Sequence, residues 1–124
     1  MTETVDALVI GAGPAGLMAA EALMAPGRTV VVAEAMPTPA RKFLMAGKSG
    51  LNLTKNEPFE AFAQRFSFGT GALPRTPGYL HEEESRFGPA EVMAWARGLG
   101  IELFTGSTGR VFPVGMKASP LLRA

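Results

Sequence analysis

Three glycines near the start of the chain, together with one acidic residue downstream, have the spacing of a site that holds a dinucleotide. Gly11, Gly13 and Gly16 form the pattern G-x-G-x-x-G, and Glu34 follows about 20 residues later. We expect Gly11 to permit a tight turn in which a Cβ would clash, Gly13 to let the backbone approach a pyrophosphate, and Gly16 to let a helix pack closely. A carboxylate at Glu34 would accept hydrogen bonds from ribose hydroxyls and would repel a ribose that carries a 2′-phosphate.

The residues around these glycines predict the strand, turn, helix and strand that such a site needs. An apolar run at 5–10 leads into the glycines, a helix-forming run at 17–24 follows them, and a second apolar run at 29–33 ends on Glu34. Pro14 suits the first position of a helix, where its missing N–H costs nothing. The start of that helix would offer N–H groups and a positive dipole end to a phosphate. The alternative is a unit whose glycines only make a tight turn, and the joint occurrence of these features favours nucleotide binding.

A second glycine-rich segment, residues 41–54, begins with two basic side chains. Arg41 and Lys42 are followed by a short apolar run and by a Gly-Lys-Ser-Gly loop at 47–50. The loop is similar to the end of a P-loop, but Lys42 stands where a P-loop has its first glycine, so we reject that interpretation. The loop is then either a backbone nest for an anion or a solvated surface loop. Its position after the dinucleotide motif favours the nest.

Hydrophobic periodicity and capping residues predict the remaining elements. They are a helix over 57–65 capped by Asn56, a helix over 90–97 that begins at Pro89 and is ended by Gly98 or Gly100, a β-hairpin of 101–104 and 110–113, and a final helix that Ser119 caps and Pro120 begins. Residues 67–80 are expected to form a loop. His81 lies among three glutamates, and we interpret this group as a solvated charge cluster rather than as a catalytic base or a metal site.

The composition of the 124 residues is that of a small soluble domain. The formal net charge of +1 gives no electrostatic case for binding nucleic acid or an anionic membrane surface. The sequence has no cysteine, which excludes disulfides and thiolate metal sites. No apolar run is long enough to cross a membrane, and the acidic N-terminus argues against a secretory signal, so we expect a cytoplasmic protein. The final predicted helix would be barely one turn long, so we expect the protein to continue beyond Ala124.

Four segments together resemble a known protein family: residues 11–16, 40–54, 109–113 and 116–124. They are similar to the bacterial NAD(P)/FAD-dependent oxidoreductases of the aminoacetone-oxidase-like type, which are flavoproteins of the glutathione-reductase-like superfamily. The first segment is shared by many flavoproteins, whereas the later segments are more specific. Many relatives have Arg-Cys-Asn in the glycine loop, where this sequence has Gly-Leu-Asn at 50–52, so a role for a thiol there is absent.

The resemblance implies that this chain binds FAD, with NAD(P)H as a candidate electron donor and a small molecule as substrate. It implies that Glu34 holds the adenosine ribose, that Arg41 and Lys42 are the family's basic pair, and that the glycine loop lies against the cofactor. The candidate cofactor-binding residues are Gly11, Ala12, Gly13, Pro14, Ala15, Gly16, Glu34, Arg41, Lys42, Gly47, Gly50 and Asn52. No catalytic residue and no metal site is assigned. The family's last flavin-binding segment and its substrate domain would lie beyond Ala124.

The expected fold is α/β, an incomplete glutathione-reductase-like Rossmann domain with parallel strands, helices and a β-hairpin. Residues 1–124 would be the N-terminal, truncated part of an FAD-binding domain. The expected function is that of the FAD-binding segment of an oxidoreductase that is active only at full length. Three alternatives stay open: an NAD-binding dehydrogenase, a flavin-dependent RNA-modification protein, and an inactive nucleotide-binding fragment. The glycine motif alone does not separate FAD from NAD, but its place near residue 10 and the segment at 41–54 favour FAD.

Overall fold

The chain folds into two compact units, residues 1–46 and residues 47–124, which are described separately. The computed structural model describes residues 2–46, 48–66 and 87–124. The loop predicted at 67–80 and the charge cluster around His81 lie outside these described residues. No helix in the described ranges combines the length and the apolar character that a membrane crossing would require.

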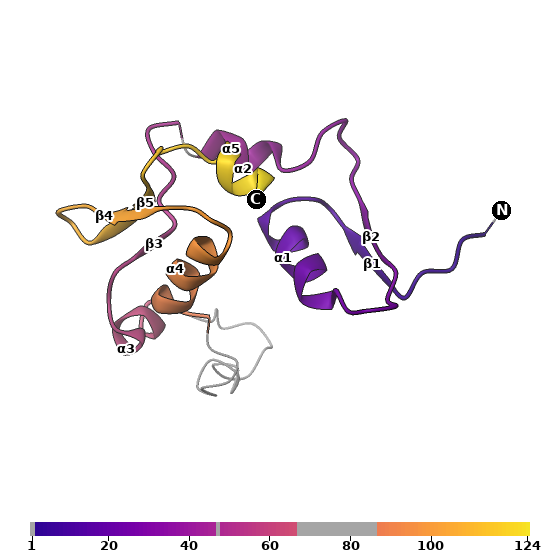
Figure 1. Cartoon of the computed structure of the whole chain (residues 1–124), viewed down its shortest axis with the longest axis horizontal. Helices are drawn as coiled ribbons and strands as arrows, with labels where there is room; N and C mark the ends of the chain where they lie inside the picture. Colours follow the sequence, from indigo (N-terminus) through magenta and orange to yellow (C-terminus); the bar gives the residue numbers. More distant parts are fainter. Residues whose placement is uncertain (1, 47, 67–86) are drawn as a thin grey trace. The chain divides into compact units, whose positions relative to one another are not determined.

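The first unit begins with the strand–helix–strand arrangement that the sequence predicts. Strand β1 (Ala7–Ile10) pairs in parallel with strand β2 (Val30–Ala33), and helix α1 (Pro14–Leu23) connects them. The register places Leu8 beside Val31. Figure 1 shows the two strands side by side, with α1 following directly from the turn after β1. The parallel strands confirm the α/β fold class.

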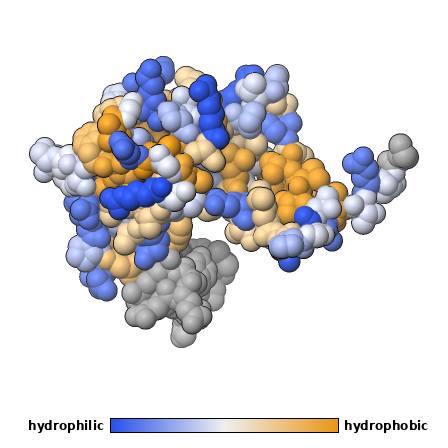
Figure 2. Space-filling model, viewed as in Figure 1, coloured by the Kyte–Doolittle hydropathy of each residue, from blue (hydrophilic) through white to orange (hydrophobic). Residues whose placement is uncertain are grey.

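Helix α1 packs against one face of this small sheet, and the other face is exposed. Val9 faces the helix and is 8% exposed. Its neighbours along β1, Leu8 and Ile10, are 57% and 84% exposed, and Val31 on β2 is 37% exposed, because successive side chains of a strand point to opposite faces. Figure 2 shows hydrophobic residues gathered over the part of the first unit that β1 and β2 form. Parallel sheets are normally covered on both faces, so this apolar surface is unusual.

A short helix, α2 (Arg41–Ala46), ends the first unit, and the sequence pattern did not predict it. It begins directly after Ala40, whose φ is 56°, in the left-handed region that non-glycine residues seldom adopt. The Leu44 N–H donates to the Ala40 carbonyl at 3.0 Å, which forms the first turn of the helix. The segment between β2 and Ala40 contains two prolines, which disfavour a helix or a central strand, and it has no regular structure.

The second unit is built around a three-stranded antiparallel sheet. Its strands are β3 (Thr54–Lys55), β4 (Leu103–Thr105) and β5 (Arg110–Pro113), in the spatial order β3-β5-β4. The predicted hairpin is therefore confirmed, with Phe104 opposite Phe112 and their rings stacked at 5.6 Å between centroids. Strand β3 was not predicted, because two residues are too few to show an alternating pattern.

Helix α4 (Pro89–Gly98) is ended by Gly100, the second of the two glycines that the sequence offered. Gly100 has a φ of 80° and donates its N–H to the Arg97 carbonyl, while the Ile101 N–H donates to the Ala96 carbonyl. This pair of bonds is the Schellman motif, in which glycine adopts the left-handed conformation after a helix. The Ile101 N–H is bonded to the helix rather than to a neighbouring strand. Strand β4 begins at Leu103, two residues later than the strand predicted at 101–104.

Two predicted helix caps are wrong. Helix α3 (Phe59–Ala63) has Pro58 rather than Asn56 at its N-cap, so the helix begins later than predicted, and the Asn56 N–H donates to the Gly109 carbonyl at 2.8 Å as a continuation of the pairing of β3. Helix α5 (Ser119–Arg123) includes Ser119, and Ala118 is its N-cap. Neither cap makes a side-chain hydrogen bond to the helix. The prediction for Asn56 used only its residue type, which carries no sign that its backbone continues the pairing of β3.

The core of the second unit consists of small and branched apolar residues. Ala96 on α4 is fully buried and Val111 on β5 is 1% exposed. Leu51, Ala118 and Leu121 are also buried. The ring of Phe59 packs against the start of α4, where a Cβ on Gly88 would lie 2.6 Å from it. The core therefore lies between strand β5 and helix α4, and helix α3 packs on the start of α4 through Phe59.

Candidate functional site

The glycine turn after β1 depends on the backbone conformation of Gly11. Its φ is 96°, and its N–H donates to the Ala33 carbonyl at 2.7 Å, which closes the end of the parallel pair. No atom lies within 4 Å of the position that a Cβ would take. A Cβ on Gly11 would therefore meet no distant atom, and glycine is favoured there because a positive φ brings a Cβ too close to the residue's own backbone.

Gly16 is the position where a side chain has no space. A Cβ there would overlap the carbonyl oxygen of Gly11, and it would lie 3.4 Å from Cγ1 of Val9. The first turn of α1 thus rests directly on the backbone that leaves β1. This contact is the close packing of helix and strand expected from the third glycine of the motif.

The start of α1 is open around Gly13. Gly13 is the N-cap, with φ −82° and ψ −177°, and nothing lies within 4 Å of its added Cβ. Pro14 and Ala15 are exposed. The Leu17 N–H donates to the Gly13 carbonyl at 2.9 Å, so the earlier N–H groups of the turn have no carbonyl one turn before them within the helix. This combination of free space and helical N–H groups suits an anionic group.

The Glu34 carboxylate is bound by two backbone N–H groups of the first unit. Oε2 accepts the Ala12 N–H at 2.9 Å, and Oε1 accepts the Met36 N–H at 2.9 Å. These bonds, that of Met36 first, hold the pKa of Glu34 below its ordinary value of 4.5, and the positive charge of Arg41 acts in the same direction. Partial removal of water opposes the shift. Glu34 is therefore an anion at neutral pH, with its orientation fixed by the backbone.

Ala12 connects the glycine turn to the chain that follows β2. Its N–H donates to Glu34, and its carbonyl accepts the Ala40 N–H at 2.8 Å. Both alanines are buried, at 3% and 4% exposure. Next in the chain, Arg41 donates from Nε to Oγ1 of Thr38 at 2.8 Å, and the other basic residue, Lys42, is exposed.

Three predicted site residues follow the first unit. Gly47 lies outside the described residues. Gly50 has a φ of 138°, and a Cβ there would overlap the Met116 side chain. Asn52 is exposed, and its two neighbours donate backbone hydrogen bonds within the second unit, from Leu51 to the Met116 carbonyl and from Leu53 to that of Val111, both at 2.9 Å. Within its own unit this segment runs beside β5.

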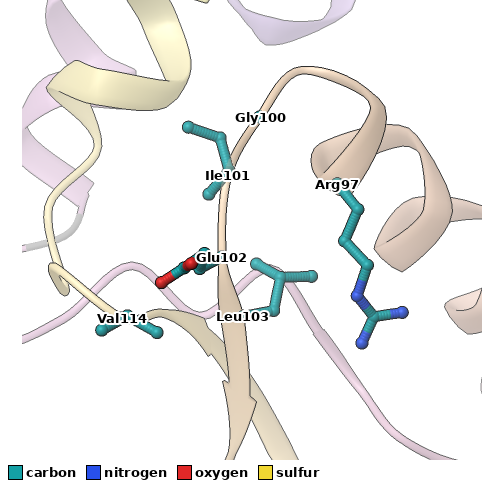
Figure 3. Close-up of a pocket in the computed structure, with 6 residues that line it drawn as sticks. All are labelled: Arg97, Gly100, Ile101, Glu102, Leu103 and Val114. Atoms are coloured by element: carbon teal, nitrogen blue, oxygen red, sulfur yellow. The ribbon is translucent and has the colours of Figure 1, made fainter.

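A shallow hollow of about 470 Å³ occurs in the second unit (Figure 3). Its lining residues are Arg97, Gly100, Ile101, Glu102, Leu103 and Val114. Glu102 and Leu103 point to opposite sides of the strand, Glu102 toward Val114 and Leu103 toward Arg97. The sequence-predicted site residues are not among its lining. In the described ranges no cluster of histidine, cysteine, aspartate or glutamate could hold a metal ion.

The first unit thus brings together the glycine turn, the start of α1 and Glu34. Sequence reasoning missed the parts that Met36 and Ala40 play in this arrangement. Both act through backbone N–H groups, which every residue except proline possesses. Their residue types therefore gave no signal, and the only available clue was their position just after the acidic residue.

Comparison with known proteins assigns the chain to a family. The family model described as "HI0933-like protein Rossmann domain" matches residues 5–124. A putrescine oxidase from Kocuria rosea is 70% identical to this chain over 30 residues. That stretch is 24% of this chain and 6% of the putrescine oxidase, so the chain matches only a small part of the length of that relative.

Proposed function

Because the chain belongs to the family of HI0933-like Rossmann-domain proteins, we propose that it is the FAD-binding segment of a flavin-dependent oxidoreductase. The observation that carries the proposal is the open space at Gly13, directly before the helical N–H groups of α1. A dinucleotide pyrophosphate needs such a close approach to the backbone, together with N–H donors and a positive helix dipole. The 70% identity to a stretch of a putrescine oxidase supports an oxidase-type reaction.

Each part of this site would have a separate task in holding the cofactor. The turn from Gly11 to Gly16 would hold the pyrophosphate against the start of α1, and Glu34 would accept hydrogen bonds from the adenosine ribose. Arg41 and Lys42, both exposed, would add positive charge near the phosphates. The flavin, when bound, supplies the hydride chemistry. This segment binds and orients it, and no catalytic residue is assigned to the segment.

The residues present fit a dinucleotide with an unmodified ribose. Glu34 is anionic at neutral pH, and each of its oxygens has accepted one backbone hydrogen bond. A carboxylate offers about four acceptor positions, and the backbone N–H of Ala35 also acts on this one, so about one position is left for a hydroxyl group. A 2′-phosphate in that place would be repelled by the carboxylate. This repulsion disfavours NADP(H) at this site but does not separate FAD from NAD; the family favours FAD, and NAD(P)H stays the candidate electron donor.

The test is to identify the nucleotide that the purified full-length protein carries. We expect a yellow protein with flavin absorbance, from which denaturation releases FAD that chromatography and mass spectrometry identify. Anaerobic addition of NADH or NADPH should bleach the flavin absorbance. Release of FMN, of NAD or of no nucleotide, together with failure to bind added FAD, would contradict the proposal.

A further inference from the structure

We propose that Glu34 is a positioning residue that locks the glycine turn to the chain after β2 before any nucleotide binds. This role is separate from contact with a ribose. It rests on the proposed function only for the expected effect on ligands, because the hydrogen bonds themselves belong to the chain alone. It predicts that loss of the carboxylate disturbs the phosphate-binding turn even for a ligand that has no ribose hydroxyls.

The first argument is the placement of the two donors. Ala12 lies inside the glycine turn, and Met36 lies two residues beyond Glu34 on the far side of β2. Each donates to a different oxygen of the same carboxylate, at 2.9 Å. One side chain therefore joins two backbone segments that are distant in the sequence. Hydrogen bonds to an ionised acceptor are about twice as strong as those between neutral groups, so the carboxylate holds the two segments more firmly than a neutral side chain would.

The second argument is the burial of Ala12. Its exposure is 3%, and its backbone N–H is covered by the exposed Glu34 carboxylate through a part-buried hydrogen bond. A buried N–H without a partner is costly, because its hydrogen bonds to water are lost and nothing replaces them. If Glu34 loses its carboxylate, the Ala12 N–H loses its fixed acceptor, and the turn has to move to let water take that place or has to leave the N–H without an acceptor. Either result displaces the backbone next to Gly11 and Gly13.

The third argument is the strained conformation at Ala40. The Ala12 carbonyl accepts the Ala40 N–H at 2.8 Å, and Ala40 has a φ of 56°. A left-handed alanine persists only where its surroundings fix it. The peptide groups at Ala12 therefore carry two constraints, one from Glu34 and one from Ala40. Together they hold the start of α2 in relation to the glycine turn.

The experiment uses amide hydrogen exchange and NMR on the isotope-labelled full chain. In Glu34→Ala we expect the Ala12 and Met36 amides to exchange on the order of tenfold faster than in the unsubstituted chain. Glu34→Gln keeps one carbonyl oxygen and should restore part of the protection. The matched control is Glu3→Gln, at an exposed glutamate, which should leave both amides unchanged. In the unsubstituted chain, the two amide signals should move together when the carboxylate is titrated with acid.

A ligand comparison separates the positioning role from ribose contact. The probes are ADP and 2′,3′-dideoxy-ADP, which has the diphosphate but no ribose hydroxyls for Glu34 to hold. Positioning predicts that Glu34→Ala weakens both probes, dideoxy-ADP by on the order of tenfold. Unchanged affinity for dideoxy-ADP, or unchanged exchange at Ala12 and Met36, would overturn the inference. If the unsubstituted chain binds neither FAD nor ADP, the proposed function fails, while the exchange measurement and the acid titration still decide the positioning role.

Discussion

Gly16 lies so close to Gly11 that a single added carbon on Gly16 would overlap the Gly11 carbonyl oxygen. The same carbon would touch Val9, which faces α1 from β1. The contact therefore sets how closely the helix approaches the strand. It also fixes the direction in which the first N–H groups of α1 point, which is the property that a phosphate site needs.

We expect Gly16→Ala to destabilise the first unit by about 1–3 kcal/mol, because a methyl group forced into a packed contact displaces the backbone. The matched control is Gly13→Ala, where nothing lies within 4 Å of the added carbon and φ is −82°. The measurement is the free energy of unfolding of each variant in urea, with hydrogen exchange of the β1 and β2 amides as the probe of the first unit. Equal stability of Gly16→Ala and the unsubstituted chain would show that the turn adjusts freely.

We expect Gly13→Val to abolish FAD binding while the fold is kept. The backbone at Gly13 is extended, which a β-branched residue adopts without strain, and the side chain would enter empty space. That space is where the pyrophosphate is proposed to approach the start of α1. The measurement is the flavin content of the purified full-length protein, with circular dichroism as the control for folding. Undiminished flavin would mean that the turn is only structural.

The unit of β1, α1 and β2 could be predicted from the sequence because its signals are local. Glycine, proline and an apolar run each act on the residues beside them. The same holds for the hairpin of β4 and β5. The family resemblance that these residues indicated is confirmed by the family model, which matches residues 5–124. Elements that depend on distant partners could not be predicted, such as β3, which exists because Leu53, Lys55 and Asn56 lie beside the hairpin.

The candidate site could be predicted in its side chains but not in its backbone contacts. Glu34 was identified by its place at the end of β2, and its interaction with ribose stays a prediction. The two N–H groups that it accepts come from Ala12 and Met36, and no property of these side chains selects them. At Asn56 the side chain was misleading: its type favours a helix cap, but the residue lies beside the sheet and its N–H bonds to the Gly109 carbonyl.

The stability of the first unit should depend on pH through Glu34. Its pKa in the folded chain is lowered from 4.5, first by the Met36 hydrogen bond and next by that of Ala12. A lowered pKa means that the carboxylate adds stability above pH 4.5, and that this stability is lost as the pH falls through the lower, folded value. We expect Glu34→Gln to be less stable than the unsubstituted chain near neutral pH, with the difference shrinking in acid. A difference that stays constant with pH would contradict the anionic role.

Two glycines at the end of α4 should respond in opposite ways to alanine. Gly98 is the last helical residue, with open space around its added carbon, so Gly98→Ala should stabilise the second unit by about 0.4–1 kcal/mol. Gly100 has a φ of 80°, and Gly100→Ala should destabilise it by about 1–2 kcal/mol, the cost of a left-handed residue with a Cβ. Thermal unfolding of the two variants measures both effects. A loss of stability in Gly98→Ala would show that the helix end differs from the one described.

The last prediction concerns the exposed apolar face of β1 and β2. Ile10 is 84% exposed and Leu8 is 57% exposed, whereas Val9 between them is buried against α1. We expect the 124-residue chain to bind the hydrophobic dye ANS at this face and to associate at high concentration, because parallel sheets are stable when both faces are covered. Ile10→Thr should lower dye fluorescence and leave stability nearly unchanged, since the side chain has little packing to lose. Val9→Thr should instead destabilise the unit by about 1–3 kcal/mol, because it places a hydroxyl in a buried contact. If Ile10→Thr destabilises the chain as much as Val9→Thr does, the face is covered in solution and the description of an open sheet is wrong.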